Sequence, residues 1–188
     1  MKKLLSLLLA LAVAFAIPAG PGLYVADAAT NGTAISTADD LKKMESNPSG
    51  SYYLANDIEV PANLTLFTDE DRPFTGTLDG DGHKIKGYTY TSNEEWSDDV
   101  ALFTYTKKAT FKDLTMTNVN ISVNNATGAA ALVATMDGGT FSNVSVSGKI
   151  TGKFLRKAGG IVADSYGGGT LTGCKNSADI TVTGAAEE

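Results

Sequence analysis

Apolar and polar residues alternate along much of the second half of the chain. Val119, Ile121 and Val123 occupy every second position. A period of two places successive side chains on opposite faces of an extended backbone, so this pattern predicts β-strands. Four turn signals separate the segments, namely Asn124-Asn125, Asp137-Gly138-Gly139, Ser147-Gly148 and Gly167-Gly168-Gly169. No helical stretch is expected between them, because these residues turn the chain with little steric cost.

The strand pattern recurs with a period of about 30 residues. Three sets of positions repeat at intervals of 30: Thr110, Thr140 and Thr170; Phe111, Phe141 and Leu171; and Leu114, Val144 and Cys174. Leu132 recurs at Ile161 after 29 residues. A repeat of this kind cannot bury its own apolar side, so we expect successive coils to stack at ~4.8 Å per layer. The second and third sets then form inward columns, and the threonines form a ladder at a corner.

The residues ahead of the repeats follow a different pattern. Thr37 precedes Asp40 by three residues, a capping box, and Leu41 and Met44 fall on one helical face, so a short helix is expected at residues 37–44. Strand-like segments follow at residues 51–60 and 74–90. We expect an irregular first coil with the helix covering its open end. After Thr183 no comparable cap is visible in the sequence.

An export signal begins the chain. Lys2 and Lys3 precede an apolar run from Leu4 to Ile17, and small residues end at Ala28. We expect cleavage after Ala28, with Ala16 as the alternative. The predicted organisation is a signal peptide at 1–28, a cap helix and first coil at 29–99, and three repeats at 100–188. No membrane span is expected after cleavage.

Composition narrows the classes of partner. The chain has 188 residues, a formal net charge of −6 and 43% hydrophobic residues, which favours a globular domain and argues against nucleic acid as a partner. Cys174 is the only cysteine. Its place in an apolar column favours a buried structural role over a reactive thiol or an intermolecular disulfide.

Two segments resemble a known family. Gly159-Gly160-Ile161-Val162 followed by residues 169–180, and a looser copy at Ala130-Ala131-Leu132-Val133 with residues 139–144, are similar to the GLUG-repeat family of bacterial secreted and surface proteins. The resemblance implies a right-handed parallel β-helix of the pectate-lyase-like class, found in adhesins and as an accessory region of some secreted peptidases. Those peptidases carry a zinc-binding H-E-x-x-H motif on a separate domain. This chain has one histidine, His83, and no such motif, so we expect no zinc proteolysis from it.

The combined prediction is an all-β right-handed parallel β-helix of about four coils with a short N-terminal capping helix. Candidate binding residues are Trp96, Tyr88, Tyr90 and Tyr105, whose rings could stack on a sugar face. Covering the edge of the core is the favoured interpretation of Trp96. The alternative sites are polar, as described next.

Carboxylates gather at three places. Asp79 and Asp81 have the spacing that begins a calcium loop, although a tight turn is favoured because the later ligands are missing. Clusters at residues 69–71 and at 94–95 with 98–99 are interpreted as solvated loops, while such clusters can also bind divalent cations or a basic partner. No resident cofactor is expected beyond this candidate Ca²⁺. No pair of facing carboxylates or basic column suggests hydrolase or lyase chemistry.

We therefore expect a non-catalytic, bacterial extracellular or cell-surface domain that binds a glycan or a host or cell-surface protein. The alternatives are an N-terminal fragment of a β-helix carbohydrate-active enzyme and a structural spacer. Because the last coil lacks a visible cap, end-to-end self-association through it is a further expectation.

Overall fold

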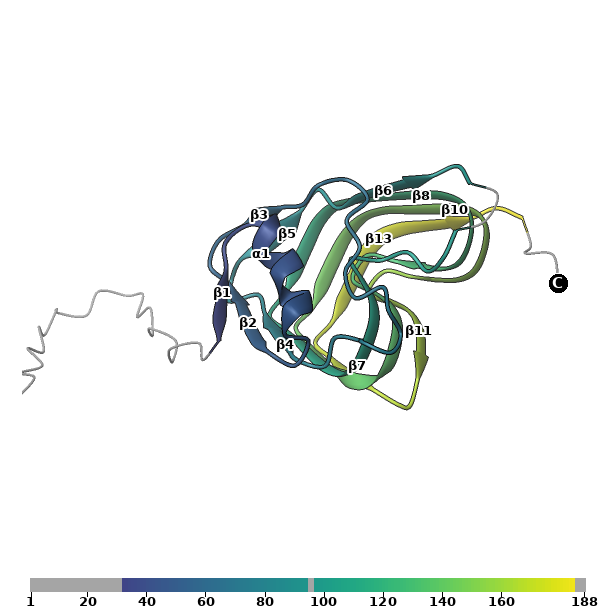
Figure 1. Ribbon diagram of the computed structural model, residues 1–188. Coiled ribbons are helices and arrows are strands. Elements are labelled where there is room, and N and C mark those ends of the chain that lie inside the picture. The colour runs from purple at the N-terminus through teal and green to yellow at the C-terminus, as the bar shows by residue number, and fades with distance from the viewer. Residues whose placement is uncertain (1–31, 95–96, 185–188) are drawn as a thin grey trace, which may run out of the picture. The chain divides into compact units, whose positions relative to one another are not determined.

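The computed structural model describes residues 32–94 and 97–184, which form a parallel β-solenoid of about four turns with one short helix near the N-terminus (Figure 1). The predicted all-β solenoid and its short helix are confirmed. The predicted signal peptide at residues 1–28 and the candidate ligand-binding residue Trp96 lie outside the described residues.

Two parallel sheets build the solenoid. The first has the order β1 (Thr33–Ile35), β2 (Ser51–Leu54), β4 (Thr77–Asp79), β7 (Phe103–Lys112), β9 (Val133–Ser142) and β11 (Val162–Tyr166), with β12 (Thr170–Thr172) also on β9. The second has the order β13 (Lys175–Val182), β10 (Ser145–Gly159), β8 (Thr115–Ala130), β5 (Lys84–Lys86) and β3 (Ile58–Glu59), with β6 (Thr89–Ser92) on β8. The long strands β8 and β10 curve round together in Figure 1. Each therefore supplies more than one side of its coil.

Register places equivalent residues of successive repeats directly over one another. Phe111 pairs with Phe141, which pairs with Leu171, and Thr110, Thr140 and Thr170 form the neighbouring column. The Phe111 and Phe141 rings are stacked with centroids 5.0 Å apart, and both side chains are fully buried. Like residues thus pack on like residues along the solenoid axis.

A β-bulge interrupts the regular spacing between β8 and β10. Val146 pairs with Met116, but Gly148 pairs with Val119, so β8 contains one extra residue. Asn118 within it has a φ of 57°. Gly148 has a φ of 137°, and a Cβ there would lie 2.1 Å from the Val119 carbonyl oxygen. The bulge accounts for the change from a 30-residue to a 29-residue interval after this point.

The corner between the two sheets is a single tight turn in each repeat. Asp113, Asn143 and Gly173 all have positive φ, at 49°, 53° and 65°. The Asn143 amide donates to the Asp113 carboxylate over 2.8 Å. Aspartate, asparagine and glycine tolerate this left-handed conformation better than other residues, so their spacing fixes where each coil turns.

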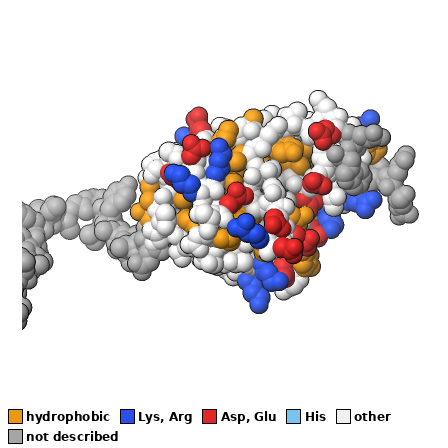
Figure 2. All heavy atoms as spheres, viewed as in Figure 1, with side chains coloured by type: hydrophobic (Ala, Val, Ile, Leu, Met, Phe, Trp, Pro, Cys, Tyr) orange, Lys and Arg blue, Asp and Glu red, His pale blue; other side chains and the backbone are white. Residues whose placement is uncertain are grey.

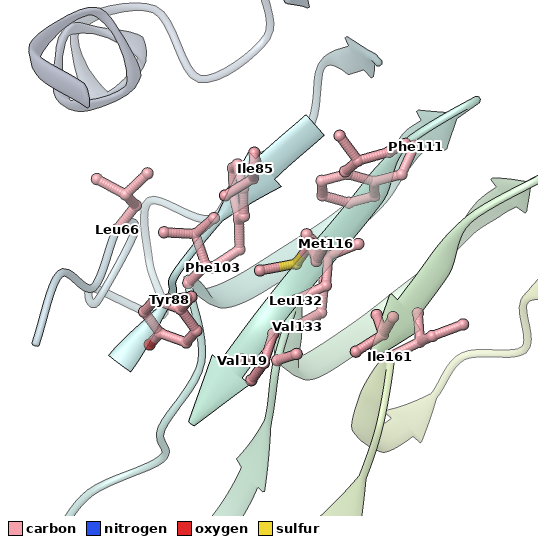
Figure 3. Packing of buried hydrophobic residues seen from close by; sticks show 14 of the residues in the cluster. Leu66, Ile85, Tyr88, Phe103, Phe111, Met116, Val119, Leu132, Val133 and Ile161 are labelled. Atoms are coloured by element: carbon pink, nitrogen blue, oxygen red, sulfur yellow. The ribbon is translucent and has the colours of Figure 1, made fainter. Parts of the chain in front are cut away.

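The interior is a continuous apolar column fed by both sheets. Figure 3 shows side chains from successive strands, including Ile85, Phe103 and Met116, converging on this interior. Phe74, Phe103 and Phe111 pack with ring centroids 5.2 to 5.7 Å apart. The irregular first coils therefore share one core with the regular repeats.

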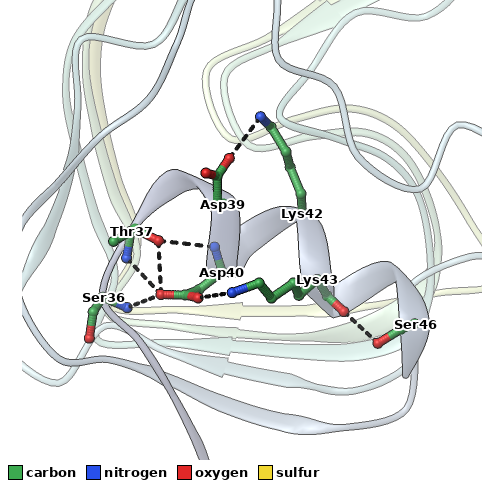
Figure 4. Close-up of polar contacts among 7 residues, drawn as sticks. All are labelled: Ser36, Thr37, Asp39, Asp40, Lys42, Lys43 and Ser46. Carbon is green, nitrogen blue, oxygen red and sulfur yellow. Dashed lines mark hydrogen bonds and ion pairs between the residues drawn. The ribbon is translucent and has the colours of Figure 1, made fainter.

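The helix α1 (Ala38–Lys43) and the following 3₁₀ turn η1 (Met44–Ser46) bury Leu41 and Met44 in this same core. Thr37 and Asp40 form the expected capping box, and Lys43 donates to Asp40 over 2.8 Å (Figure 4). The bonds from Lys43, Thr37 and the Ser36 amide lower the pKa of Asp40 to about 2. A charged Asp40 also suits the first turn of a helix.

The last coil differs from those before it. Leu171, Ile180 and Val182 are 50%, 38% and 42% exposed. Cys174 is partly buried against the core, with its thiol 3.5 Å from the Phe141 carbonyl oxygen. None of the helices within the described ranges is long and apolar enough to cross a membrane.

Candidate functional site

The structure separates the tyrosines that the sequence suggested as a sugar platform. Tyr88 follows Gly87, whose φ is 68°, and its ring is fully buried with no partner for its hydroxyl. Tyr90 packs partly buried against the core. Tyr88 therefore cannot stack on a ligand from solution, whereas Tyr105 in β7 is half-buried and lines a pocket.

Asp79 and Asp81 form the corner before β5. Asp79 is 7% exposed, forms an ion pair with Lys112, and accepts a 2.9 Å hydrogen bond from the Asp81 amide. Asp81 has a φ of 46°. These contacts serve the turn, and a Ca²⁺ at Asp79 would compete with Lys112. Across residues 32–94 and 97–184, no three His, Cys, Asp or Glu side chains are grouped so as to hold a metal ion.

A pocket of about 210 Å³ opens beside Tyr105. Its lining comes from β7, β9, β11 and the loop of residues 68–73, and comprises Glu70, Pro73, Tyr105, Thr106, Lys107, Thr135, Asp137 and Tyr166. The loop is held at both ends, because Leu66 bridges to Phe103 and Phe74 bridges to Thr106. An insertion in one coil thus forms a wall over the strands of the next three layers of the sheet.

The two tyrosines of this pocket come from different layers. Tyr105 pairs with Thr135, and Tyr166 pairs with Asp137 on the same middle strand, β9. With β9 between them, β7 and β11 lie roughly 10 Å apart. Thr135 and Asp137 therefore lie between two rings, one half-buried and one 47% exposed.

Carboxylates dominate the charge around the pocket. Lys107 pairs with Asp137 over 3.0 Å, and Lys157 pairs with Asp164. The Tyr166 hydroxyl lies 3.5 Å from a Glu70 carboxylate oxygen. Asp99 accepts a 2.8 Å hydrogen bond from Thr135. Figure 2 shows Asp and Glu side chains gathered near β11, with some Lys or Arg among them.

This charge is felt by both tyrosines. Burial, followed by the charges of Asp99, Glu70 and Asp98, raises the pKa of Tyr105. Partial burial, followed by Glu70 and Asp137, raises the pKa of Tyr166. Both acidic loops recognised in the sequence therefore act at one place, the pocket between these rings.

Sequence reasoning missed Tyr166 and Glu70 as partners. A signal for Tyr166 was present, because it follows Asp137 by 29 residues, the interval that applies after the bulge. The approach of Glu70 depends on how the loop of residues 68–73 folds back, and no repeat spacing predicts that.

A second, shallower groove of about 300 Å³ lies on the outer face of the second sheet. It is lined mainly by hydroxyl and amide side chains, with one lysine: Asn93, Ser122, Val123, Asn124, Thr151, Gly152, Lys153, Thr181 and Thr183. Ser122, Thr151 and Thr181 form one column, because Thr151 pairs with both of the others. The lining contains no carboxylate.

Comparison with known proteins gives two matches. The model of the M26 IgA1-specific metallo-endopeptidase N-terminal region matches residues 23–148. Halomucin of Haloquadratum walsbyi (strain DSM 16790 / HBSQ001) is 29% identical over 155 residues, which cover 73% of this chain and 2% of halomucin. The chain thus spans a small fraction of that relative. No solved structure matches the chain.

These matches support an extracellular or cell-surface domain. They also correct the expectation that the protein is not an enzyme, because the matching model belongs to a peptidase family, although to its N-terminal region. The absence of a catalytic set in these residues was not sufficient ground for that expectation. The GLUG resemblance stays a prediction. The family model covers more than half of the sequence, and the chain therefore belongs to the M26 IgA1-specific metallo-endopeptidase N-terminal region family.

Proposed function

We propose that this chain is an extracellular docking region through which a peptidase of this family holds its protein target. The observation that carries the proposal is the Tyr105–Tyr166 pocket. Two aromatic rings face outward around a recess in an otherwise polar strand surface, and such rings supply much of the contact energy in protein recognition.

The fold supports this role physically. The pocket lies on three parallel strands that are paired along their length, so its residues are held without a ligand. Rigid positioning lowers the entropy lost on binding. The wall at residues 68–73 is also anchored at both ends. A target segment would therefore meet a preformed recess.

Immunoglobulin A1 is the probe, because the family description names it. Binding of residues 29–188 to immobilised immunoglobulin A1 is measured by biolayer interferometry. We expect Tyr166→Ala to weaken binding roughly tenfold, as for an aromatic contact residue. The matched control is Tyr53→Ala, because Tyr53 is a half-buried tyrosine on β2 of the same sheet and does not line the pocket.

The result that overturns the proposal is either no binding at all or equal binding by the Tyr166→Ala and wild-type chains. Circular dichroism of both variants checks that the fold is retained. Tyr166 is 47% exposed, so its replacement should leave the core intact.

A second candidate function is glycan binding in the groove of the second sheet. The favouring observation is its lining of hydroxyl and amide groups, which match the hydrogen-bonding groups of a sugar. A glycan array probed with residues 29–188 tests it. Binding lost in Asn124→Ala and kept in Thr117→Val, which lies outside the groove, supports this function; no array signal rejects it.

A further inference from the structure

We infer that the Tyr105–Tyr166 pocket selects a cationic side chain, arginine or lysine, on the polypeptide that docks there. This inference rests on the proposed docking function and adds the chemical class of the group recognised. It follows from the balance of charge around the pocket and from the two rings that border it.

The charge balance favours a cation. Asp137 and Asp164 are each matched by a lysine, Lys107 and Lys157. The ion pairs found among the described residues include none from Glu70, Asp98 or Asp99. All three nonetheless act on Tyr105. A surplus of negative charge in a recess with low-dielectric walls attracts a positive group and repels an anion.

The rings add a second, independent attraction. A guanidinium or ammonium group over a tyrosine face gains cation–π energy, which increases when the group leaves water. Tyr166 is the more accessible ring and lies next to Glu70. An arginine laid over this ring can also donate to the Glu70 carboxylate, so one ligand group satisfies both features.

The pocket lining also has hydrogen-bonding capacity that the protein leaves unused. Thr106 is 2% exposed, and its hydroxyl has no hydrogen-bond partner. Asp99, by contrast, already accepts from Thr135 and is held in place. A donor-rich group such as guanidinium, which has five N–H donors, suits a lining that is rich in acceptors.

The first experiment compares two peptides that differ only in charge. Acetyl-Gly-Arg-Gly-amide and acetyl-Gly-citrulline-Gly-amide have nearly the same shape, but citrulline is neutral. Titration into ¹⁵N-labelled residues 29–188 is followed by NMR shifts of the Tyr105, Asp137 and Tyr166 amides. We expect the arginine peptide to bind about five- to tenfold more tightly, and the difference to shrink in about 0.5 M salt.

Two pairs of variants locate the effect. Glu70→Gln should reduce the preference for arginine about threefold, whereas Glu59→Gln, an exposed glutamate on β3, should leave it unchanged. Tyr166→Phe should retain most of the binding because the ring remains, whereas Tyr166→Leu should lose it. Unchanged affinity in both Glu70→Gln and Tyr166→Leu contradicts the inference.

The outcome separates this inference from the docking function. If Tyr166→Ala weakens binding of immunoglobulin A1 while the arginine and citrulline peptides bind equally, docking stands and cation selection is rejected. If the arginine peptide is preferred at the pocket and immunoglobulin A1 does not bind, cation selection stands and the proposed target is rejected. A preference for arginine with shifts elsewhere than the pocket overturns the inference.

Discussion

The middle and last coils contain nearly the same pattern but differ in burial. Phe141 and Ile150 of the middle coil are fully buried, whereas Leu171 and Ile180, their partners in register, are 50% and 38% exposed. The apolar pattern of the sequence is equally clear in both coils. The difference arises because β9 and β10 have a strand on each side, whereas β13 pairs on one side.

Burial in a solenoid is therefore supplied by the next layer rather than by the residue itself. The same holds at the beginning of the solenoid, where α1 and η1 supply Leu41 and Met44 to the core. An apolar residue contributes its full share of stability only where two neighbouring layers remove it from water. The following predictions test this comparison.

The largest effect is expected from removing equivalent apolar side chains in the two coils. Phe141→Ala should lower the free energy of unfolding by about 3–5 kcal/mol, because it leaves a cavity under a fully buried ring. Leu171→Ala should cost less than about 1 kcal/mol, because half of Leu171 is already in water. Urea unfolding followed by circular dichroism measures both. Equal losses would show that the last coil is covered in solution.

The next effect concerns a backbone position shared by the two coils. Gly148 pairs in register with Ala178. Gly148→Ala should cost about 2–4 kcal/mol, because Gly148 has a φ of 137° and its new Cβ would meet the Val119 carbonyl. Ala178→Gly should cost about 0.5–1 kcal/mol, since it adds only chain entropy in the unfolded state. The same urea experiment distinguishes them, and a neutral Gly148→Ala would contradict the bulge geometry.

A smaller effect on stability, but a direct one on assembly, is expected at the open strand edge. We propose that residues 29–188 self-associate through the last coil, because exposed strand edges with apolar side chains pair readily. Leu171→Lys should change stability by less than about 1 kcal/mol and reduce association. Sedimentation velocity over a range of concentrations measures it. A wild-type chain that stays monomeric at all concentrations rejects the proposal.

The smallest effect is expected at the capped end. The pKa of Asp40 is lowered from 3.8 to about 2 in the folded chain, so its charge favours folding above the unfolded value and is lost as the pH falls through about 2. Helix α1 should therefore fray in acid while the last coil is unaffected. Amide exchange at residues 36–41 measures this, and Asp40→Asn should remove the pH dependence. Equal acid sensitivity at both ends would contradict it.

The repeats were predictable because their register follows from interval and alternation alone. The corner at Asp113, Asn143 and Gly173 repeats every 30 residues with residue types that accept positive φ. The capping box of Thr37 and Asp40 was equally local, since it depends on three neighbouring positions. Such features need no knowledge of distant parts of the chain.

The pocket was predictable only in part. Its acidic loops and Tyr105 were recognised separately, but their meeting with Tyr166 spans up to 96 residues in sequence. Tyr88 was interpreted as an outward ring, yet the turn at Gly87 directs it into the core. Contacts that depend on the path of an irregular loop leave no periodic signal, so alternation and spacing could not reveal them.

The bulge at Asn118 has an evolutionary consequence for how such a gene can gain or lose coils. Unequal crossover between repeats yields a working coil only when both break points lie on the same side of the bulge, because the interval is 30 residues before it and 29 after it. A crossover across it shifts the reading of the coil by one residue. Since strands alternate faces, every apolar residue downstream would then point to solvent. The extra residue in β8 thus restricts which recombinants of this sequence can fold.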